Sequence, residues 1–346
     1  MNRTSLLALA ASSAILLFAA TPANAVLTLT ADGVSAGFNL TTFVSGYNFG
    51  GNYGPIGQGI SSTGHVITGS VGDQKIYVFN DVDNQGLGDA VASHSYACQT
   101  GNCNYAMATA GGQVYGAQLF GGTYEHFADD GTSTVITSLR DAGLRGYLGM
   151  WGDPNTGHIL AASNFGLVNI DPVAGAFTVI NGGLFPDGVS VSPDSSTLFV
   201  ENGGTIQSYN ATTGALIHTF FTGHQPDGTG VILGGVHNGK VVVNNNDGTV
   251  GLLDPSLLDG NPNQFIIIAS GGTRGDFVSA DRSNGTLFIA ELNDVHRLSC
   301  GQGCSIGGPT DTVPEPASWA LLILGFGAMG AVLRRRRAPG LGFAAA

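Results

Sequence analysis

The chain of 346 residues repeats a short pattern at a nearly constant spacing, and this repeat constrains the fold more than any other feature. Each copy contains a short β-rich run, a turn and a second β-rich run. An average period of about 44 residues is that of a four-stranded propeller blade. We therefore predict an all-β propeller of about six blades. The apolar anchors of the six copies are Val66, Val114, Ile159, Leu198, Val241 and Leu287.

A second repeated segment precedes each anchor and predicts the innermost strand of each blade. Its clear copies are PDGVSV at 186–191 and PDGTGV at 226–231. The stretch PDGVSVSPDSSTLFV at 186–200 resembles the repeat of YVTN/NHL-type and lactonase-like propellers, and this resemblance implies the same fold for the body. It is strong for one blade and faint for the others. The weaker copies of the segment are 58–60, 104–106, 145–147 and 276–278.

Two other arrangements fit the same short strands. Residues 26–38 joined with the C-terminal segment could form a degenerate seventh blade. A pair of β-sandwiches also has short strands at regular spacing. The regular period favours a single ring, so we expect one propeller domain over residues 26–313.

Propellers place functional groups where the innermost strands open onto the central channel. Carboxylate and amide oxygens there would suit Ca²⁺, the one cofactor that the sequence suggests. Aspartate in Pro-Asp-Gly also caps its own turn, which is its ordinary role. The presence of a metal therefore stays unknown. The six candidate ligand-binding positions at the channel mouth are Gln58, Asn104, Arg145, Asp187, Asp227 and Asp276.

Two further segments carry weaker signals for chemistry. Residues 81–86, DVDNQG, resemble the start of an EF-hand calcium loop, but Ala92 replaces the bidentate glutamate at the twelfth position. An acidic hairpin loop is the better interpretation. His224 stands just before a Pro-Asp-Gly segment and could act as a general base, although an ordinary loop histidine fits as well. The sequence thus predicts no catalytic residue.

The charge of the chain excludes one class of function. Twelve lysines and arginines stand against 24 acidic residues, and the formal net charge is −12. Nucleic-acid binding requires clustered cations, so we expect no nucleic-acid partner. Without its two ends the body carries about −16, which suits divalent cations or neutral glycans better than anionic polymers.

The N-terminus reads as a secretory signal peptide over residues 1–25. Arg3 supplies the positive region, an apolar stretch runs from Leu6 to Ala20, and Ala23-Asn24-Ala25 forms a small-residue cleavage site. We therefore expect an exported protein.

The C-terminus, residues 314–346, carries a second targeting signal. An uncharged run of 16 residues from Ser318 to Leu333 is followed by a cluster of arginines. This tail resembles the PEP-CTERM sorting signal, which implies a transmembrane helix in the bacterial inner membrane, processing by an exosortase, and association with exopolysaccharide at the cell surface or outside it. The residues that carry the resemblance are Pro314, Glu315, Pro316, Trp319, Arg334, Arg335, Arg336 and Arg337.

The four cysteines form two close pairs, Cys98 with Cys103 and Cys300 with Cys304. In an oxidising compartment each pair should close a local disulfide. A shared zinc site is the alternative, and it requires the two pairs to meet in space.

Two functions remain open on these observations. The first is a non-catalytic surface propeller that binds exopolysaccharide or a surface protein. The second is a propeller hydrolase or lyase that uses a divalent cation at the channel mouth. The first requires no residue that the sequence lacks, and we favour it.

Overall fold

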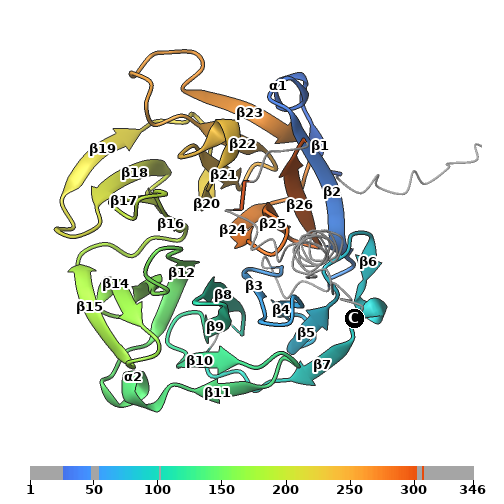
Figure 1. Ribbon diagram of the computed structural model, residues 1–346, viewed down its shortest axis with the longest axis vertical. Helices are drawn as coiled ribbons and strands as arrows, with labels where there is room; N and C mark the ends of the chain where they lie inside the picture. The colour runs from blue at the N-terminus through green and yellow to red at the C-terminus, as the bar shows by residue number, and fades with distance from the viewer. Residues whose placement is uncertain (1–25, 48–53, 101–102, 302–305, 308–346) are drawn as a thin grey trace, which may run out of the picture.

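The structure, a computed structural model, describes residues 26–47, 54–100, 103–301 and 306–307. These residues form a closed ring of six sheets around a central axis, antiparallel throughout except for the pairing of β2 with β6 (Figure 1). The innermost strands of neighbouring sheets contact one another in the order β3, β8, β12, β16, β20, β24 and back to β3. The six-bladed propeller predicted from the repeat is confirmed, and the sandwich alternative is wrong.

The first three blades each consist of four strands from one continuous part of the chain. The first contains β3 (Gln58–Ile60), β4 (Val66–Ser70), β5 (Lys75–Phe79) and β7 (Ala92–Ser95). The second contains β8 (Tyr105–Ala110), β9 (Gln113–Gln118), β10 (Tyr124–Phe127) and β11 (Ser133–Val135). The third contains β12 (Gly146–Gly152), β13 (Ile159–Ser163), β14 (Gly166–Asp171) and β15 (Ala176–Asn181).

The other three blades follow the same plan, and the fifth and sixth gain strands from the N-terminal part of the chain. The fourth contains β16 (Val189–Val191), β17 (Thr197–Asn202), β18 (Thr205–Asn210) and β19 (Leu216–Phe220). The fifth contains β20 (Pro226–Val231), β21 (Val241–Asn245), β22 (Val250–Leu253), β23 (Phe265–Ser270) and the short β1 (Thr28–Leu29). The sixth contains β24 (Gly275–Asp281), β25 (Thr286–Glu291), β26 (Asp294–Cys300), β2 (Phe38–Ser45) and β6 (Gln85–Gly86).

The N-terminal strands close the ring instead of forming a seventh blade. β1 pairs antiparallel with β23 and β2 pairs antiparallel with β26, so both add to existing sheets. The seventh blade considered for residues 26–38 is therefore wrong. An outer strand from the far end of the chain satisfies the exposed edge of the last blade, which would otherwise present unpaired backbone groups.

Helices contribute little to the described part of the chain. The two α-helices, α1 (Ala31–Ser35) and α2 (Thr137–Asp141), have five residues each, and two 3₁₀ turns cover Leu87–Asp89 and Gly235–His237. Within these described residues no helix has the length and apolar character needed to cross a membrane. The helices predicted for the signal peptide and for the C-terminal tail lie outside the described residues.

The repeat anchors occupy one structural position. All six lie on the second strand of their blade, and all are fully buried. Aliphatic side chains at this position pack between neighbouring blades, where burial removes about 25 cal/mol of unfavourable hydration per Å² of apolar surface. The sequence repeats about every 44 residues because each blade places its second strand, with the same buried aliphatic residue, at the same position in the ring.

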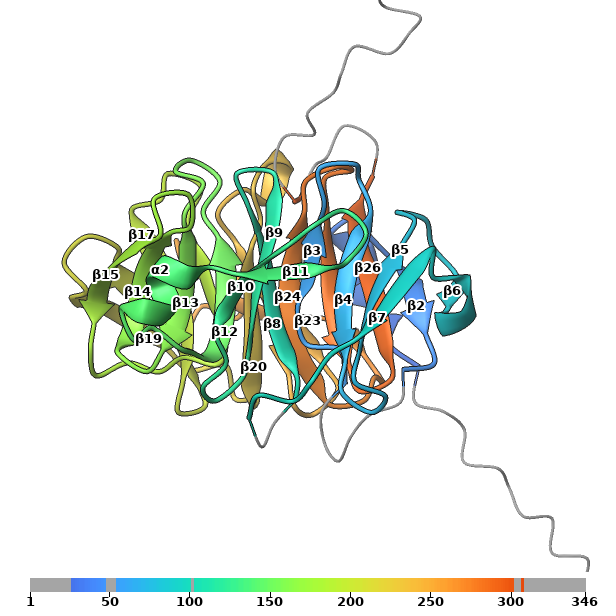
Figure 2. The same ribbon diagram turned by 90° about the horizontal axis from the view of Figure 1, so that it is seen from below.

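The propeller has two faces, seen edge-on in Figure 2. We call the face where the innermost strands begin, near Asp187 and Asp227, the mouth face. The opposite face, where β20 ends at Val231 and β24 ends at Asp281, is the tail face. Ile306 lies on the tail face, since its N–H donates to Gly285 at 2.9 Å and its carbonyl accepts from Leu233 at 2.9 Å.

Candidate functional site

The two Pro-Asp-Gly segments enter the innermost strands of the fourth and fifth blades. A side chain at Gly188 would collide with the backbone of Asp227 and Thr229, and one at Gly228 would collide with the backbone of Asp276. Neither glycine has a positive φ. Glycine is therefore needed for close approach of neighbouring strands, and this approach brings the three aspartates together.

Asp187, Asp227 and Asp276 form a carboxyl cluster at the mouth face. Asp227 is 4% exposed and Asp276 is 7% exposed, while Asp187 is partly exposed. The side chains of Asp187 and Asp227 are hydrogen-bonded to each other. On the other side, Arg274 Nη2 donates to Asp227 Oδ2 at 2.9 Å, and Arg274 Nε donates to Asn246 Oδ1 at 2.6 Å.

The cluster shifts the acidity of its members in a consistent way. Burial raises the pKa of Asp187 to about 9, helped by the charge of Asp227 and by the hydrogen bond between them. Burial, and then the charge of Asp227, raises the pKa of Asp276 well above its usual range. Burial also raises the pKa of Asp227, but the hydrogen bond from Asp187 and the charge of Arg274 oppose this increase.

These shifts give the mouth a balanced charge at neutral pH. Asp187 is protonated there, and the neutral form of Asp276 is favoured. Asp227 remains the partner of the Arg274 guanidinium. The site thus offers O–H and N–H donors beside carboxyl acceptors.

Glu201 borders this cluster at the end of β17. Its pKa is raised by burial, and the charge of Asp227 adds to the increase. Neither Glu201 nor Arg274 was among the sequence candidates. Arg274 stands two residues before Asp276, just ahead of the weak copy at 276–278, and this position was the only available signal.

The other three candidates lie apart from the carboxyl cluster. Asn104 is buried and donates through Nδ2 to the carbonyl of Gly54 at 2.7 Å. Arg145 turns toward α2, where its Nη1 donates to the carbonyls of Arg140 and Leu144.

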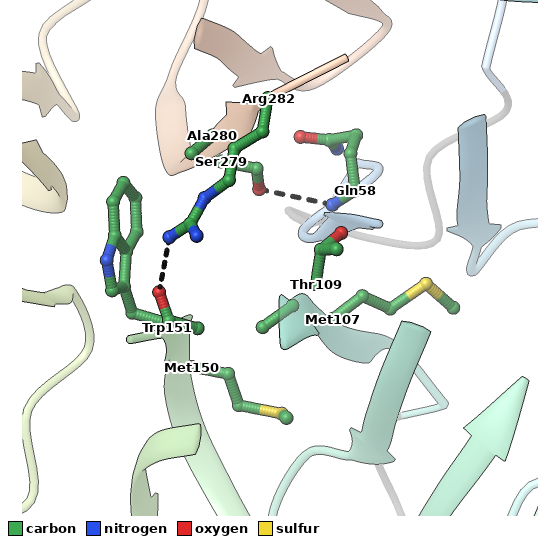
Figure 3. A pocket seen from close by; sticks show the side chains of 10 residues that line it. Gln58, Met107, Thr109, Met150, Trp151, Ser279, Ala280 and Arg282 are labelled. Carbon is green, nitrogen blue, oxygen red and sulfur yellow. Dashed lines mark hydrogen bonds between the residues drawn. The ribbon is translucent and has the colours of Figure 1, made fainter. Parts of the chain in front are cut away.

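Gln58 lies deeper in the channel, beside a cavity of about 10 Å³ (Figure 3). Its backbone N–H donates to Ser279 Oγ at 3.2 Å, and its Oε1 has no hydrogen-bond partner in the described part of the chain. Trp151 and Arg282 line the same cavity, and Arg282 donates to the carbonyl of Gly152 at 3.2 Å. A space of this volume holds about one water molecule.

The carboxyl cluster does not fit a calcium ion as it stands. Calcium takes six to eight oxygen ligands around one point. Within the ranges that the structure describes, no three His, Cys, Asp or Glu side chains are arranged to hold a metal. One Asp227 oxygen is also occupied by Arg274, and protonated carboxyls are poor cation ligands.

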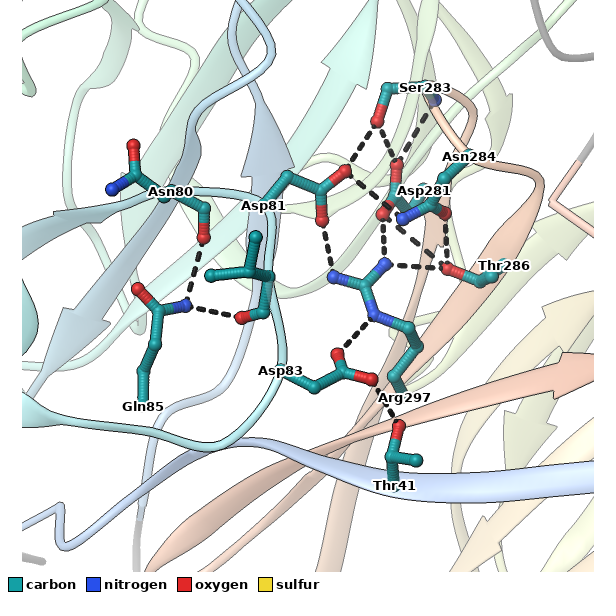
Figure 4. A network of polar contacts seen from close by, with 11 residues as sticks. Thr41, Asn80, Asp81, Asp83, Gln85, Asp281, Ser283, Asn284, Thr286 and Arg297 are labelled. Atoms are coloured by element: carbon teal, nitrogen blue, oxygen red, sulfur yellow. Dashed lines mark hydrogen bonds and ion pairs between the residues drawn. The ribbon is translucent and has the colours of Figure 1, made fainter.

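The calcium-like loop at 81–86 binds an arginine (Figure 4). Arg297 on β26 forms ion pairs with Asp81, with Asp83 at 2.7 Å and with Asp281 at 2.6 Å. Gln85 donates to the carbonyls of Asn80 and Val82 and shapes the turn. The guanidinium therefore takes the place that a cation would have in this acidic loop, in agreement with the hairpin interpretation.

His224 is hydrogen-bonded to Asp247, with 2.7 Å between Nδ1 and Oδ2. Asp247 stands in the turn between β21 and β22, and neither residue contributes to the shifted pKa values of the carboxyl cluster. The pair therefore does not complete an acid–base arrangement with Asp187.

Cys98 and Cys103 form the predicted disulfide. Cys300 is also disulfide-bonded, and its predicted partner, Cys304, lies outside the described residues. The chain has no free cysteine in its described part. This pairing leaves no thiolates for the alternative zinc site.

Comparison with known proteins gives information on two parts of the chain, the C-terminal tail and the propeller. The sequence beyond Gly307 combines the Pro-Glu-Pro triplet, the apolar run and the arginine cluster described above. Residues 312–337 match the PEP-CTERM protein-sorting motif. This motif implies an exported protein with a membrane-anchored precursor that an exosortase processes. No curated protein matches this sequence.

Several solved structures resemble the propeller of this chain. A gluconolactonase from Xanthomonas campestris is 14% identical, with a TM-score of 0.56 over 80% of this chain and 95% of that chain. A luciferin-regenerating enzyme is 11% identical, with a TM-score of 0.53 over 79% of this chain and 99% of that chain. At this level of identity the likeness establishes the propeller fold alone.

Proposed function

We propose that this PEP-CTERM protein is a non-catalytic binding protein of the cell surface or extracellular matrix, and that its mouth holds a neutral, hydroxyl-rich ligand such as the sugar units of an exopolysaccharide. The carboxyl cluster carries the proposal. Sugar hydroxyls both donate and accept hydrogen bonds, and the neutral Asp187 and the Asp227–Arg274 pair offer both partners in one place.

The charge balance of the mouth supports a neutral ligand over a cation or an anion. A divalent cation would have to displace protons from Asp187 and Asp276, so its affinity should be low at neutral pH. A polyanion would meet a protein with a net charge of −12. A neutral glycan faces neither obstacle.

Binding is tested by thermal melting of the full-length chain with glucose, galactose and mannose, and with neutral hexasaccharides of each. A ligand that prefers the folded state raises Tm. We expect a concentration-dependent rise with at least one sugar at pH 7, and no comparable rise with Ca²⁺ over EDTA. A rise with Ca²⁺ and none with any sugar would contradict the proposal and favour the metal-dependent alternative.

A matched pair of variants connects the binding to the mouth. Asp187→Leu removes the hydroxyl donor without removing a charge at pH 7, so the fold should survive while sugar binding is lost. Asp259→Leu is the control. Asp259 lies in the loop between β22 and β23 of the fifth blade, is exposed, and pairs with His218 on β19. Equal sugar binding by both variants would show that the mouth is not the site.

One observation favours a second function, hydrolysis of a lactone. A protonated carboxyl beside a carboxylate is the arrangement of a general acid and its base, and the pKa of Asp187 suits proton donation near neutral pH. Some proteins of the same fold are named as gluconolactonases. Proton release from glucono-δ-lactone by the full-length chain, absent in Asp187→Leu, would support this function. No rate above the spontaneous one would rule it out for this substrate.

A further inference from the structure

Three aromatic rings form a continuous row on the mouth face across the second, third and fourth blades. The rings of Phe120 and Tyr147 lie edge to face with centroids 5.2 Å apart, and those of Tyr147 and Phe185 follow at 5.5 Å. Phe120 and Phe185 are each 43% exposed. We call these three residues the aromatic platform. Contiguous exposed apolar surface of this kind marks binding sites in soluble proteins.

The backbone holds one ring of the platform in an unfavourable conformation. Phe120 has φ of 58°, a left-handed value that bulky residues rarely adopt and that costs of order 1 kcal/mol or more. Two hydrogen bonds fix it there, because its N–H donates to Tyr147 at 3.0 Å and the N–H of Gly121 donates to Gly146 at 2.8 Å. Glycine or asparagine would adopt this backbone conformation with less strain than phenylalanine, so the fold itself does not require the aromatic ring.

The platform adjoins the carboxyl cluster. Phe185 stands two residues before Asp187 in the chain, and Tyr147 stands two residues before Gly149. The Gly149 N–H donates to the carbonyl of Pro186 at 3.3 Å, which connects the third blade to the segment that carries Phe185 and Asp187. An extended chain advances about 3.3 Å per residue, so the backbone positions of Phe185 and Asp187 are at most about 7 Å apart. The platform therefore lies next to the carboxyl cluster.

We infer that the aromatic platform is a second subsite that stacks the sugar rings of a polysaccharide whose neighbouring unit lies in the carboxyl-lined mouth. The inference rests on the proposed function and extends it from a sugar to a chain. Pyranose rings present C–H groups with partial positive charge, and these groups pack on the negative face of an aromatic ring. Hydroxyls at the ring edges remain free to bond in the mouth.

The position of the platform favours this ligand over a lipid surface. Ile306, the start of the last described segment before the sorting motif, lies on the tail face. The platform lies on the mouth face, so it points away from the side of the ring at which the described chain leaves toward the tail. A polymer outside the cell can therefore approach the platform from the face opposite to Ile306.

The test compares binding of a monosaccharide with binding of its hexasaccharide by isothermal titration calorimetry on the full-length chain. The sugar is whichever of glucose, galactose or mannose raises Tm. Phe120→Asn combined with Phe185→Ser removes two rings, and asparagine tolerates the left-handed backbone at position 120. The control is Phe221→Ser, since Phe221 is an exposed phenylalanine outside the platform. Size-exclusion chromatography follows the oligomeric state of each protein.

The expected result is a hexasaccharide affinity at least about tenfold above that of the monosaccharide in wild type and in Phe221→Ser. The double variant should lose this difference and keep its monosaccharide affinity. Equal hexasaccharide affinity in the double variant and wild type would overturn the platform and leave the mouth proposal standing. Intact monosaccharide binding in Asp187→Leu, with the hexasaccharide preference retained, would overturn the mouth and spare the platform. A change of oligomeric state in the double variant would identify the platform as a contact between copies of the chain and overturn the sugar subsite.

Discussion

Arg297 on β26 donates through Nε to Asp83 at 2.7 Å, although the two residues are 214 positions apart in the sequence. Asp83 lies in the connection from β5 of the first blade to β6 of the sixth, so this bond holds the segment that joins the first and last blades. The guanidinium also lies within 5.0 Å of the ring centroids of Phe43 and Phe288. Closure therefore combines the pairing of β2 with β26 and a buried charge that three carboxylates share.

Replacing this arginine should weaken the whole propeller. Arg297→Met leaves Asp81, Asp83 and the fully buried Asp281 without their cation, and breaking one side of a buried ion pair costs about 3–5 kcal/mol. We expect a fall in Tm of roughly 10 °C by differential scanning calorimetry. The control Arg140→Met disrupts an exposed pair with Asp141 and should shift Tm by less than about 2 °C. Equal shifts in the two variants would show that the Arg297 network does not hold the ring closed.

The close approach of the innermost strands should make the Pro-Asp-Gly glycines intolerant of a methyl group. Gly228→Ala places a Cβ against the backbone of Asp276 and should destabilise the protein by about 1–3 kcal/mol, with loss of the carboxyl cluster geometry. Gly88→Ala is the matched control, because a Cβ there meets nothing within 4 Å. Urea denaturation measures both. If Gly228→Ala left the free energy of unfolding unchanged, the innermost strands would be able to move apart and accept the methyl group without loss of stability.

The blades and two of the three clustered aspartates could be predicted from the sequence. The repeat anchors placed all six blades, since burial between blades imposes the same apolar position in each copy. The aspartates at 187 and 227 were recognised as neighbours through their Pro-Asp-Gly motifs. Arg145 was aligned with them by a weak copy, but the residue beside Asp187 is Gly149, four positions later.

The remaining parts of the site depend on contacts between distant segments. Gln58 lies deeper than the aspartates because Gly57 packs against Met107, which is well inside β8. Without a motif, sequence spacing cannot fix the offset between neighbouring innermost strands to within three residues. The Arg297 network and the aromatic platform join residues from different blades, and no local pattern records those contacts.

The disulfide between Cys98 and Cys103 should make a modest and local contribution to stability. It closes a loop with a sequence separation of five, and loop-closure entropy for so short a loop is worth about 2 kcal/mol. The loop includes Gln99, whose side chain donates to Glu125 at 2.8 Å. We expect the double variant Cys98→Ser, Cys103→Ser to lower Tm by a few degrees and to increase amide hydrogen exchange in 96–104. Unchanged exchange in that segment would contradict a local role.

The raised pKa values of the carboxyl cluster predict that stability declines toward alkaline pH. The pKa of Asp187 is about 9 in the folded protein, against about 3.9 for a free aspartate. Between these values the folded state holds a proton that the unfolded state has released, so the free energy of unfolding falls as pH rises from about 4 to 9. Asp187→Asn removes this proton difference. The Tm of the variant should match that of wild type near pH 4 and exceed it by about 5 °C at pH 8.5.

Asp194→Asn serves as the control. Hydrogen bonds from Ser192 and Ser196 lower the pKa of Asp194 to about 2, so the contribution of Asp194 to stability changes only in acid. Parallel Tm curves for Asp187→Asn and wild type between pH 5 and 9 would show that Asp187 is ionised in the folded protein, and the neutral mouth would then be wrong.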